Sequence, residues 1–230
     1  MINCYMKNNK IMSFLKKVYY TSSSVRYIEF LKKQGVEIGS GCIFRAPKTT
    51  IIDMTRPYLI SIGNNVDMNV NFKIYTHDWG ARVFIGKYNQ MINSSGKVTI
   101  GSNIYFGADC MVLKGVTIGD NCIIGAGSIV SKSIPSNSVA LGNPCRVVCS
   151  LEEYYQKRLK KAPMEAAELV NAFYERKRHY PLPNELTEEE IYYKSDSTFG
   201  GRFNSFDEFI ECVNNKRNNF QCINDSQIPQ

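Results

Sequence analysis

The sequence contains few of the residues that build metal sites. Its 230 residues include two histidines and one tryptophan, and its eight cysteines are scattered, with no Cys-x-x-Cys pair. Because zinc sites need clustered cysteines and histidines, we expect no bound metal. Scattered thiols do not make a dense disulfide framework either, so we expect reduced cysteines and a cytoplasmic protein.

Long hydrophobic runs are absent as well. No window of about 18 uninterrupted apolar residues occurs, so the sequence predicts no transmembrane segment. The N-terminal residues are interrupted by lysine and asparagine and lack a small-residue cleavage site, which argues against a secretory signal. With 43% apolar and 21% charged residues, the chain should form a packed core.

Charge is distributed unevenly along the chain. Residues 1–150 carry 17 Lys and Arg against 7 Asp and Glu, whereas residues 151–230 carry 11 against 14, which agrees with the net charge of +7. A basic first part favours an anionic ligand such as a phosphorylated cofactor, an acidic polysaccharide or nucleic acid. Its basic residues do not form a run with interleaved aromatics, so nucleic acid is the least favoured of the three.

A six-residue repeat runs from Val98 to Pro135. One row of apolar residues returns every six positions, at Ile100, Phe106, Val112, Ile118, Ile124 and Val130. This period fits neither an α-helix nor a simple strand, and it is typical of a hexapeptide β-helix rather than an ordinary β meander. Cys42, Cys110 and Cys122 fall in its small inward slot, so we expect them to be core residues.

The repeat is interrupted before this stretch. It begins at Val36, is lost from Pro47 to Pro57, and resumes at Ile60. After Ile74 the next clean apolar slot is Ile100, so residues 79–97 are predicted to be an inserted loop. Insertions in regular solenoids often carry function. His77 stands where this loop leaves the repeat, and a histidine can act as a general base.

Three segments follow from these patterns. Residues 1–35 are predicted to be an N-terminal helical segment, broken at residues 21–24, and residues 36–150 a β-helix domain. The N-terminal helices should cover the open end of the coil, although their lysine-rich face also allows an acceptor or membrane-surface role. Residues 151–230 are predicted to be a helical extension, with helices over 151–161 and 163–178 and further helix starts at 187 and 205.

Residues 60–148 resemble the hexapeptide-repeat acyltransferases, in the maltose and galactoside O-acetyltransferase branch. The likeness is greatest to the O-acetyltransferases encoded with capsule and surface-polysaccharide genes. It is carried by YTHDW (75–79), GKYNQMINSSGKVTIG (86–101), VLKGVTIGDNCIIGAGSIVSKSIP (112–135) and LGNPCRVV (141–148). The resemblance implies a left-handed β-helix, a homotrimer with active sites at subunit boundaries, acetyl-coenzyme A as acyl donor, and a sugar or polysaccharide acceptor.

The resemblance also implies roles for single residues. The catalytic histidine of the family matches His77. Its coenzyme A contacts match Ala108, Ala126, Ser131, Lys132 and Arg146, with Ser131 standing where the family commonly has threonine. On the same analogy Asp78, Trp79, Tyr88 and Asn89 are candidate acceptor contacts, and Asp78 is open to a second role in orienting a nitrogen of His77.

The chemistry of a thioester fits these roles. A thioester is already activated, so a base that deprotonates a well-placed hydroxyl is sufficient, without an acyl-enzyme. Lys132 and Arg146 offer positive charge to phosphates, and the Ala108 N–H is a candidate donor to the oxyanion. Three alternatives remain: an N-acyltransferase acting on an amino sugar, a non-catalytic hexapeptide scaffold, and a γ-class carbonic anhydrase, which binds zinc through three histidines.

Overall fold

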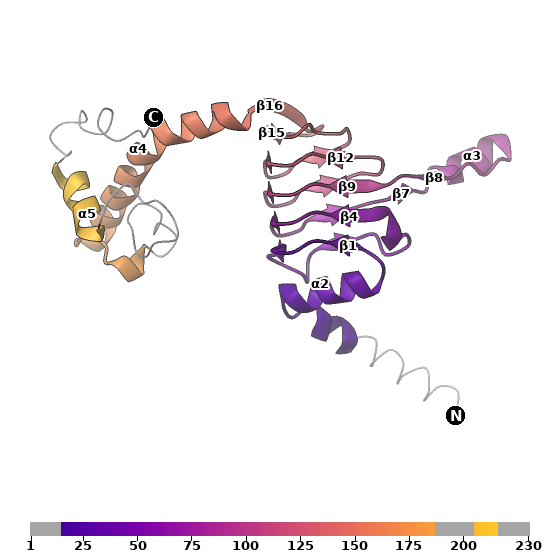
Figure 1. Cartoon of the computed structure of the whole chain (residues 1–230), viewed down its shortest axis with the longest axis horizontal. Helices are drawn as coiled ribbons and strands as arrows, with labels where there is room; N and C mark the ends of the chain where they lie inside the picture. The colour runs from indigo at the N-terminus through magenta and orange to yellow at the C-terminus, as the bar shows by residue number, and fades with distance from the viewer. Residues whose placement is uncertain (1–14, 187–204, 216–230) are drawn as a thin grey trace. The chain divides into compact units, whose positions relative to one another are not determined.

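Three parallel sheets wrap into a continuous coil in the computed structural model, which describes residues 15–186 and 205–215. Each turn of the coil adds one short strand to each sheet, and the strands stack from one turn to the next (Figure 1). The predicted mainly β architecture, a parallel β-helix with helices at either end, is therefore confirmed.

The strands of the three sheets are short. Sheet A contains β1 (Glu37–Ile38), β4 (Ile60–Ile62), β9 (Val98–Ile100) and β12 (Thr117–Ile118). Sheet B contains β2 (Ile43–Phe44), β5 (Val66–Met68), β10 (Ile104–Phe106), β13 (Cys122–Ile124), β15 (Ser138–Leu141) and β16 (Arg146–Ser150). Sheet C contains β3 (Ile51–Ile52), β6 (Lys73–Ile74), β11 (Met111–Val112) and β14 (Ile129–Val130). All pairs are parallel except β15 with β16, which close the coil.

The six-residue row forms the core because its members stack in register. In sheet C, Ile74 pairs with Val112 and Val112 pairs with Val130, and all three are fully buried. The small inward slot behaves as expected, since Cys110 and Cys122 are both buried. Burial raises the pKa of the Cys110 thiol to about 11, so this residue stays a protonated core side chain.

The edges between the sheets are turned by residues that tolerate a left-handed backbone. At the first edge, from sheet A to sheet B, Asn65, Asn103, Asn121 and Asn137 all have φ between 54° and 58°. Asparagine adopts this conformation more readily than most residues. The side chains also form a ladder, because the Asn103 amide donates to Asn121 at 2.8 Å and the Asn121 amide donates to Asn137 at 3.0 Å. The second edge leads from sheet B to sheet C, and the third edge from sheet C to sheet A.

Helices cover the first coil. Residues 15–20 are helical, and α2 (Ser24–Lys33) follows after the break that the sequence predicted. Ser23 caps α2 by accepting the Arg26 N–H at 3.3 Å. Tyr27 packs edge-on against Phe44 of the first coil, with ring centroids 5.1 Å apart. The predicted part of this segment before residue 15 lies outside the described residues.

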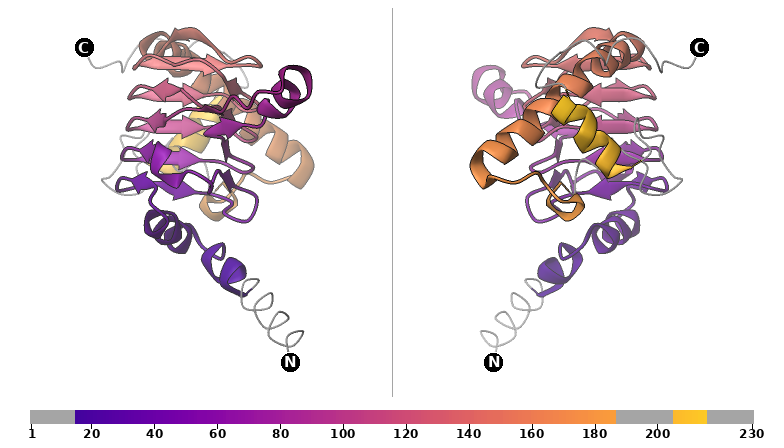
Figure 2. Two further views of the ribbon diagram at one scale, coloured as in Figure 1. Left: turned by 90° about the vertical axis from the view of Figure 1, so that its right-hand side faces the viewer. Right: turned by 90° about the vertical axis from the view of Figure 1, so that its left-hand side faces the viewer.

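The third edge carries extra chain in two successive coils. A regular coil crosses this edge between Val112 and Ile118, which are neighbours in the six-residue row, whereas the preceding coil crosses it between Ile74 and Ile100. The added stretch, 77–96, forms an arm with an antiparallel base of β7 (His77–Asp78) and β8 (Ser94–Ser95). Where the sequence predicted a loop, the arm contains α3 (Ala81–Tyr88) and projects away from the coil (Figures 1 and 2).

The coil before the arm is also lengthened at this edge. Its crossing from Ile52 to Ile62 is longer than the regular crossing from Val112 to Ile118, and η1 (Pro57–Leu59) occupies part of the addition. This is the region in which the repeat was lost from the sequence. Two successive coils therefore carry added chain at the third edge.

The C-terminal part forms a second compact unit, which is divided from the first after Tyr154. The prediction of two helices over 151–178 is wrong, since α4 is one helix from Leu151 to Lys177. Proline inside a helix removes one backbone hydrogen bond, but the residues on either side of Pro163 are strong helix formers, and the helix continues through it. After η2 (Pro183–Glu185), α5 (Phe206–Asn215) forms near the predicted start at 205, and the predicted start at 187 lies outside the described residues. Within the described ranges, no helix is long and apolar enough to span a membrane.

Candidate active site

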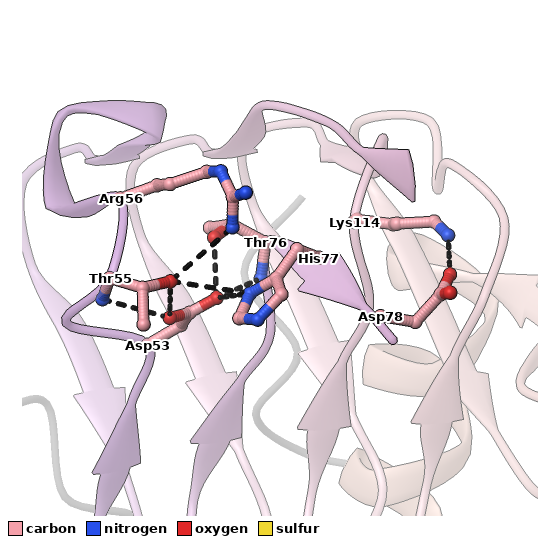
Figure 3. Close-up of polar contacts among 7 residues, drawn as sticks. All are labelled: Asp53, Thr55, Arg56, Thr76, His77, Asp78 and Lys114. Carbon is pink, nitrogen blue, oxygen red and sulfur yellow. Dashed lines mark hydrogen bonds and ion pairs between the residues drawn. The ribbon is translucent and has the colours of Figure 1, made fainter. Parts of the chain in front are cut away.

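A histidine and a buried aspartate meet at the third edge from two successive coils. Asp53 follows β3 directly, and its backbone N–H donates to the Ile74 carbonyl at 3.0 Å, which places its side chain under the start of the arm. His77 is the first residue of the arm. Its Nδ1 lies 2.5 Å from Asp53 Oδ2 (Figure 3). Asp53 is only 7% exposed, whereas the His77 side chain is 27% exposed.

Two threonines surround the Asp53 carboxylate with donors. Thr55 donates its N–H at 3.0 Å and its hydroxyl at 2.6 Å to Oδ1. Thr76 donates its N–H at 3.0 Å and its hydroxyl at 2.6 Å to Oδ2. Burial raises the pKa of the Asp53 carboxyl, but the hydrogen bonds from Thr55, Thr76 and His77 outweigh it and hold this pKa well below its usual range. Asp53 is therefore ionised at neutral pH.

The ionised carboxylate decides which nitrogen of His77 carries the proton. A carboxylate without a proton can only accept hydrogen bonds, so the close contact with Nδ1 requires a proton on Nδ1. In the neutral ring Nε2 is then the unprotonated nitrogen. An imidazole held in this tautomer can take a proton from a hydroxyl through Nε2.

Asp78 does not share this contact. Its carboxylate is exposed, accepts the Gly80 N–H at 2.8 Å and forms an ion pair with Lys114 of the next coil (Figure 3). Lys114 also contacts the Ser94 hydroxyl, so this lysine ties both strands of the arm base to the coil. Of the two roles open to Asp78, orientation of His77 falls to Asp53 instead, and Asp78 fixes the base of the arm.

The other acceptor candidates lie along the arm. Trp79 and Tyr88 are 59% and 57% exposed. Asn89 ends α3 in the left-handed conformation at φ 53°, and its N–H donates to the Ile85 carbonyl at 3.1 Å, so its geometry is that of a helix cap. Tyr88 and Asn89 stand at the far end of α3 from His77, which is at the arm base (Figure 1).

Ala108 and Ala126 lie together at the second edge. They occupy the same place on successive coils, and the Ala108 carbonyl accepts the Gly127 N–H at 2.8 Å. A side chain at Gly107 would come within 2.5 Å of the Ala126 nitrogen, so glycine permits this close stacking. Neither alanine N–H has a partner within residues 15–186 and 205–215. The second edge therefore presents two small side chains and two backbone N–H groups that are available as donors.

The remaining cofactor candidates are divided between two places. Ser131 and Lys132 follow β14 and are exposed at the third edge, where the register places Lys132 two coils beyond Thr76, the residue before His77. Arg146 is exposed at the start of β16, where its guanidinium donates to the Cys145 carbonyl at 2.8 Å. The fold therefore places Lys132 on the same edge as His77, while Ala108 and Ala126 stand on another edge of the same chain.

Sequence analysis missed Asp53 and its two threonines. These residues lie in or beside segments where the six-residue period fails, so their phase cannot be read from the repeat. The available signal is the Asp-Met-Thr order of residues 53–55, which is typical of a turn in which an aspartate accepts the N–H two residues on. That bond is present here, from the Thr55 N–H to Asp53 at 3.0 Å.

The chain is similar to a known protein family and to several known proteins. Residues 97–132 match the family model described as bacterial transferase hexapeptide (six repeats). Protein CapG of Staphylococcus aureus is 41% identical over 132 residues, which cover 57% of this chain and 76% of the relative. Galactoside O-acetyltransferase of Escherichia coli K12 is 34% identical over 156 residues, which cover 64% of this chain and 74% of the relative.

A solved structure shows a weaker likeness. The maltose O-acetyltransferase of Clostridium difficile 630 is 27% identical, the match covers 63% of this chain and 87% of that one, and the TM-score is 0.40. The coil of parallel strands is consistent with the left-handed β-helix of the matched family. Because CapG and the galactoside O-acetyltransferase match at 41% and 34% identity over 76% and 74% of their lengths, this chain belongs to the hexapeptide-repeat transferase family, among its acetyltransferases.

Proposed function

We propose that this protein transfers the acetyl group of acetyl-coenzyme A to a sugar hydroxyl, with His77 as general base. The sugar belongs to a surface polysaccharide or to its precursor. The observation that carries the proposal is the contact of His77 Nδ1 with the buried, ionised Asp53, which leaves Nε2 free to accept a proton. One relative is by its name a galactoside O-acetyltransferase, which supports a sugar acceptor. Five cysteines are free thiols, and four of these are buried, which fits a reaction in the reducing cytoplasm: Cys42, Cys110, Cys122, Cys145 and Cys149.

The reaction needs one proton to be moved twice. As the acceptor oxygen bonds to the thioester carbonyl carbon, its proton passes to His77 Nε2, and the negative charge of Asp53 stabilises the resulting imidazolium. When the carbon–sulfur bond breaks, the same proton goes to the departing sulfur, which gives free coenzyme A and the acetyl ester. The free N–H of Ala108 is the proposed donor to the oxyanion between these two steps.

A homotrimer with sites at its subunit boundaries is part of the proposal. His77 and the stacked alanines Ala108 and Ala126 belong to different edges of one chain, which supports a site completed by a neighbouring subunit. The arm supports it too, since Val83, Met91 and Ile92 are each more than half exposed and would gain cover from a second copy.

Removing the proposed phosphate contacts should weaken binding of the acyl donor. Lys132→Gln and Arg146→Gln are each expected to raise the Kd for coenzyme A by about tenfold, because each removes a charge-assisted hydrogen bond. Calorimetric titration measures this directly. Lys33→Gln, which changes an exposed lysine at the end of α2, is the matched control and should leave the Kd unchanged. Unchanged Kd values for both site variants would reject these two assignments.

The kind of bond formed separates the proposal from its alternatives. The purified protein is incubated with acetyl-coenzyme A and matched acceptors, such as glucose and glucosamine oligosaccharides, and the products are identified by mass spectrometry. We expect an acetyl ester, which mild alkali removes. An alkali-stable amide on the amino sugar would favour N-acetylation, and the absence of turnover across a broad sugar panel would favour a non-catalytic scaffold.

A further inference from the structure

A pocket lies beside the first coil, where the N-terminal helical residues face the chain around β3. Its volume is about 910 Å³, which is in the range of small-molecule sites. Its walls come from two stretches, residues 16–30 and residues 47–54. Besides covering the coil, the first stretch carries the lysine-rich face for which the sequence allowed an acceptor role.

The charge of the pocket is of one sign. Lys16, Lys17 and Lys48 line it, and no acidic side chain does. None of these lysines has an ion-pair partner in the part of the chain that the structure describes. Positive charges without a counter-ion raise the local concentration of anions. Three of them match the two charges of a diphosphate better than the single charge of a carboxylated sugar.

A buried hydroxyl in the same pocket also lacks a partner. Tyr27 lines the pocket and is only 7% exposed, and its hydroxyl makes no hydrogen bond to any residue within 15–186 and 205–215. A buried hydroxyl without a partner is costly, and an oxygen of a ligand would satisfy it. Burial raises the pKa of Tyr27 to about 12, so the hydroxyl keeps its proton at neutral pH and is a donor to an anion.

The rest of the lining is apolar and aromatic. The rings of Tyr20 and Phe30 are 4.9 Å apart and form one wall, and Ile51 and Met54 contribute to the other. Such walls suit an isoprenoid chain or a flat ring, and not a bare inorganic anion. The lining as a whole therefore fits a ligand with a diphosphate and an apolar or ring-containing body.

The pocket is joined to the His77 site through three consecutive residues. Met54 lines the pocket, and its neighbours Asp53 and Thr55 approach His77 Nδ1 at 2.5 Å and 3.3 Å. His77 belongs to the coil next to that of Met54, and one coil step is about 4.8 Å, the spacing of hydrogen-bonded strands. A ligand in the pocket can thus extend one end toward the base.

We propose that this pocket binds the carrier end of the acceptor, a diphosphate attached to an apolar or ring-containing group, and that the sugar on the other side of the diphosphate reaches His77. The identification of this ligand as the acceptor rests on the proposed function, whereas its binding does not. Two carriers share the chemistry, a nucleoside and an isoprenoid. The sugar would then be acetylated while still attached to its carrier.

Binding is tested by calorimetry on the full chain without any acyl donor. The probes are UDP-glucose for the nucleoside carrier, farnesyl diphosphate for the isoprenoid carrier, and glucose as the uncharged control. We expect one diphosphate to bind and glucose not to bind. The double variant Lys17→Gln/Lys48→Gln should raise the Kd of that diphosphate by about tenfold or more, and Tyr27→Phe should raise it several-fold. The probe that binds identifies the carrier.

Two controls keep the result decisive. Lys33→Gln, an exposed lysine on the same helix as Tyr27, should leave the Kd unchanged, and circular dichroism melts show whether each variant folds. His77→Ala should bind the diphosphate with the wild-type Kd. Loss of acetyl transfer and loss of binding in the pocket are therefore measured separately. The proposal is overturned if neither diphosphate binds below about 1 mM, or if the lysine and tyrosine variants bind the probe as tightly as the wild type.

Discussion

Replacing His77 by alanine is expected to lower kcat for acetyl transfer by about 10²- to 10⁴-fold, the usual contribution of a positioned general base. The imidazole is held by the ionised Asp53 with Nε2 unprotonated, so its loss removes the acceptor for the hydroxyl proton. Release of free coenzyme A, followed with a thiol reagent at saturating acceptor, measures the rate.

The same variant should keep its other properties. His77 does not touch the stacked alanines of the second edge, so the Kd for coenzyme A should stay within about twofold of the wild type. His179→Ala is the matched control, because it changes the other histidine, which is exposed and bonded to the Tyr180 carbonyl in the C-terminal unit. Acetyl transfer by His77→Ala at the wild-type rate would refute the general-base role.

The regular part of the fold could be predicted from sequence because its period is local. Each inward residue, such as Phe106 or Val112, is six positions from the next. In the coil these residues stack in register on neighbouring strands. The asparagines at the first edge recur once in each coil, as at Asn103 and Asn121, since each must turn the chain at the same phase. No long-range information is needed for any of these positions.

The site could be predicted only in part, for the same reason. His77 was found because it stands where the period stops, but its partner Asp53 belongs to the preceding coil, which is itself lengthened at the third edge. Two consecutive irregular coils must stack before these side chains meet, and no local pattern encodes that. The helix α3 was missed because it is only 8 residues long and contains Gly86, so its apolar spacing is a weak signal.

Replacing Asp53 by asparagine is expected to reduce kcat by about 10²- to 10⁴-fold while leaving the KM for the acceptor nearly unchanged, as a misoriented or wrongly protonated base would. Asparagine has nearly the same shape, but its amide carries a donor that faces either the threonine donors or His77 Nδ1. The imidazole then loses the contact that fixes the proton on Nδ1. Asp67→Asn, which breaks only the exposed ion pair with Arg45 on sheet B, is the matched control and should keep full activity.

A double variant separates a positioning role from a merely structural one. If Asp53 acts through His77, Asp53→Asn should lower kcat no further in a His77→Ala background. A change that only impairs folding would lower kcat in both backgrounds. Fully additive losses would show that Asp53 does not act through His77.

The free energy of unfolding should decrease as the pH falls, because Asp53 is ionised in the folded protein. The pKa of Asp53 is lower in the folded protein than its ordinary value of about 4, so its stabilisation is fully present above that value and is lost as the pH falls toward the folded pKa. At pH 7 Asp53→Asn should therefore unfold more easily by about 1–3 kcal/mol, the cost of buried donors that lose their acceptor. Below about pH 4 the two proteins should converge, because the wild type then has to retain a charge that the unfolded chain has already neutralised. Urea unfolding of both proteins across this range tests the relation, and a constant difference at all pH values would mean that Asp53 is not held ionised by its threonine and histidine donors.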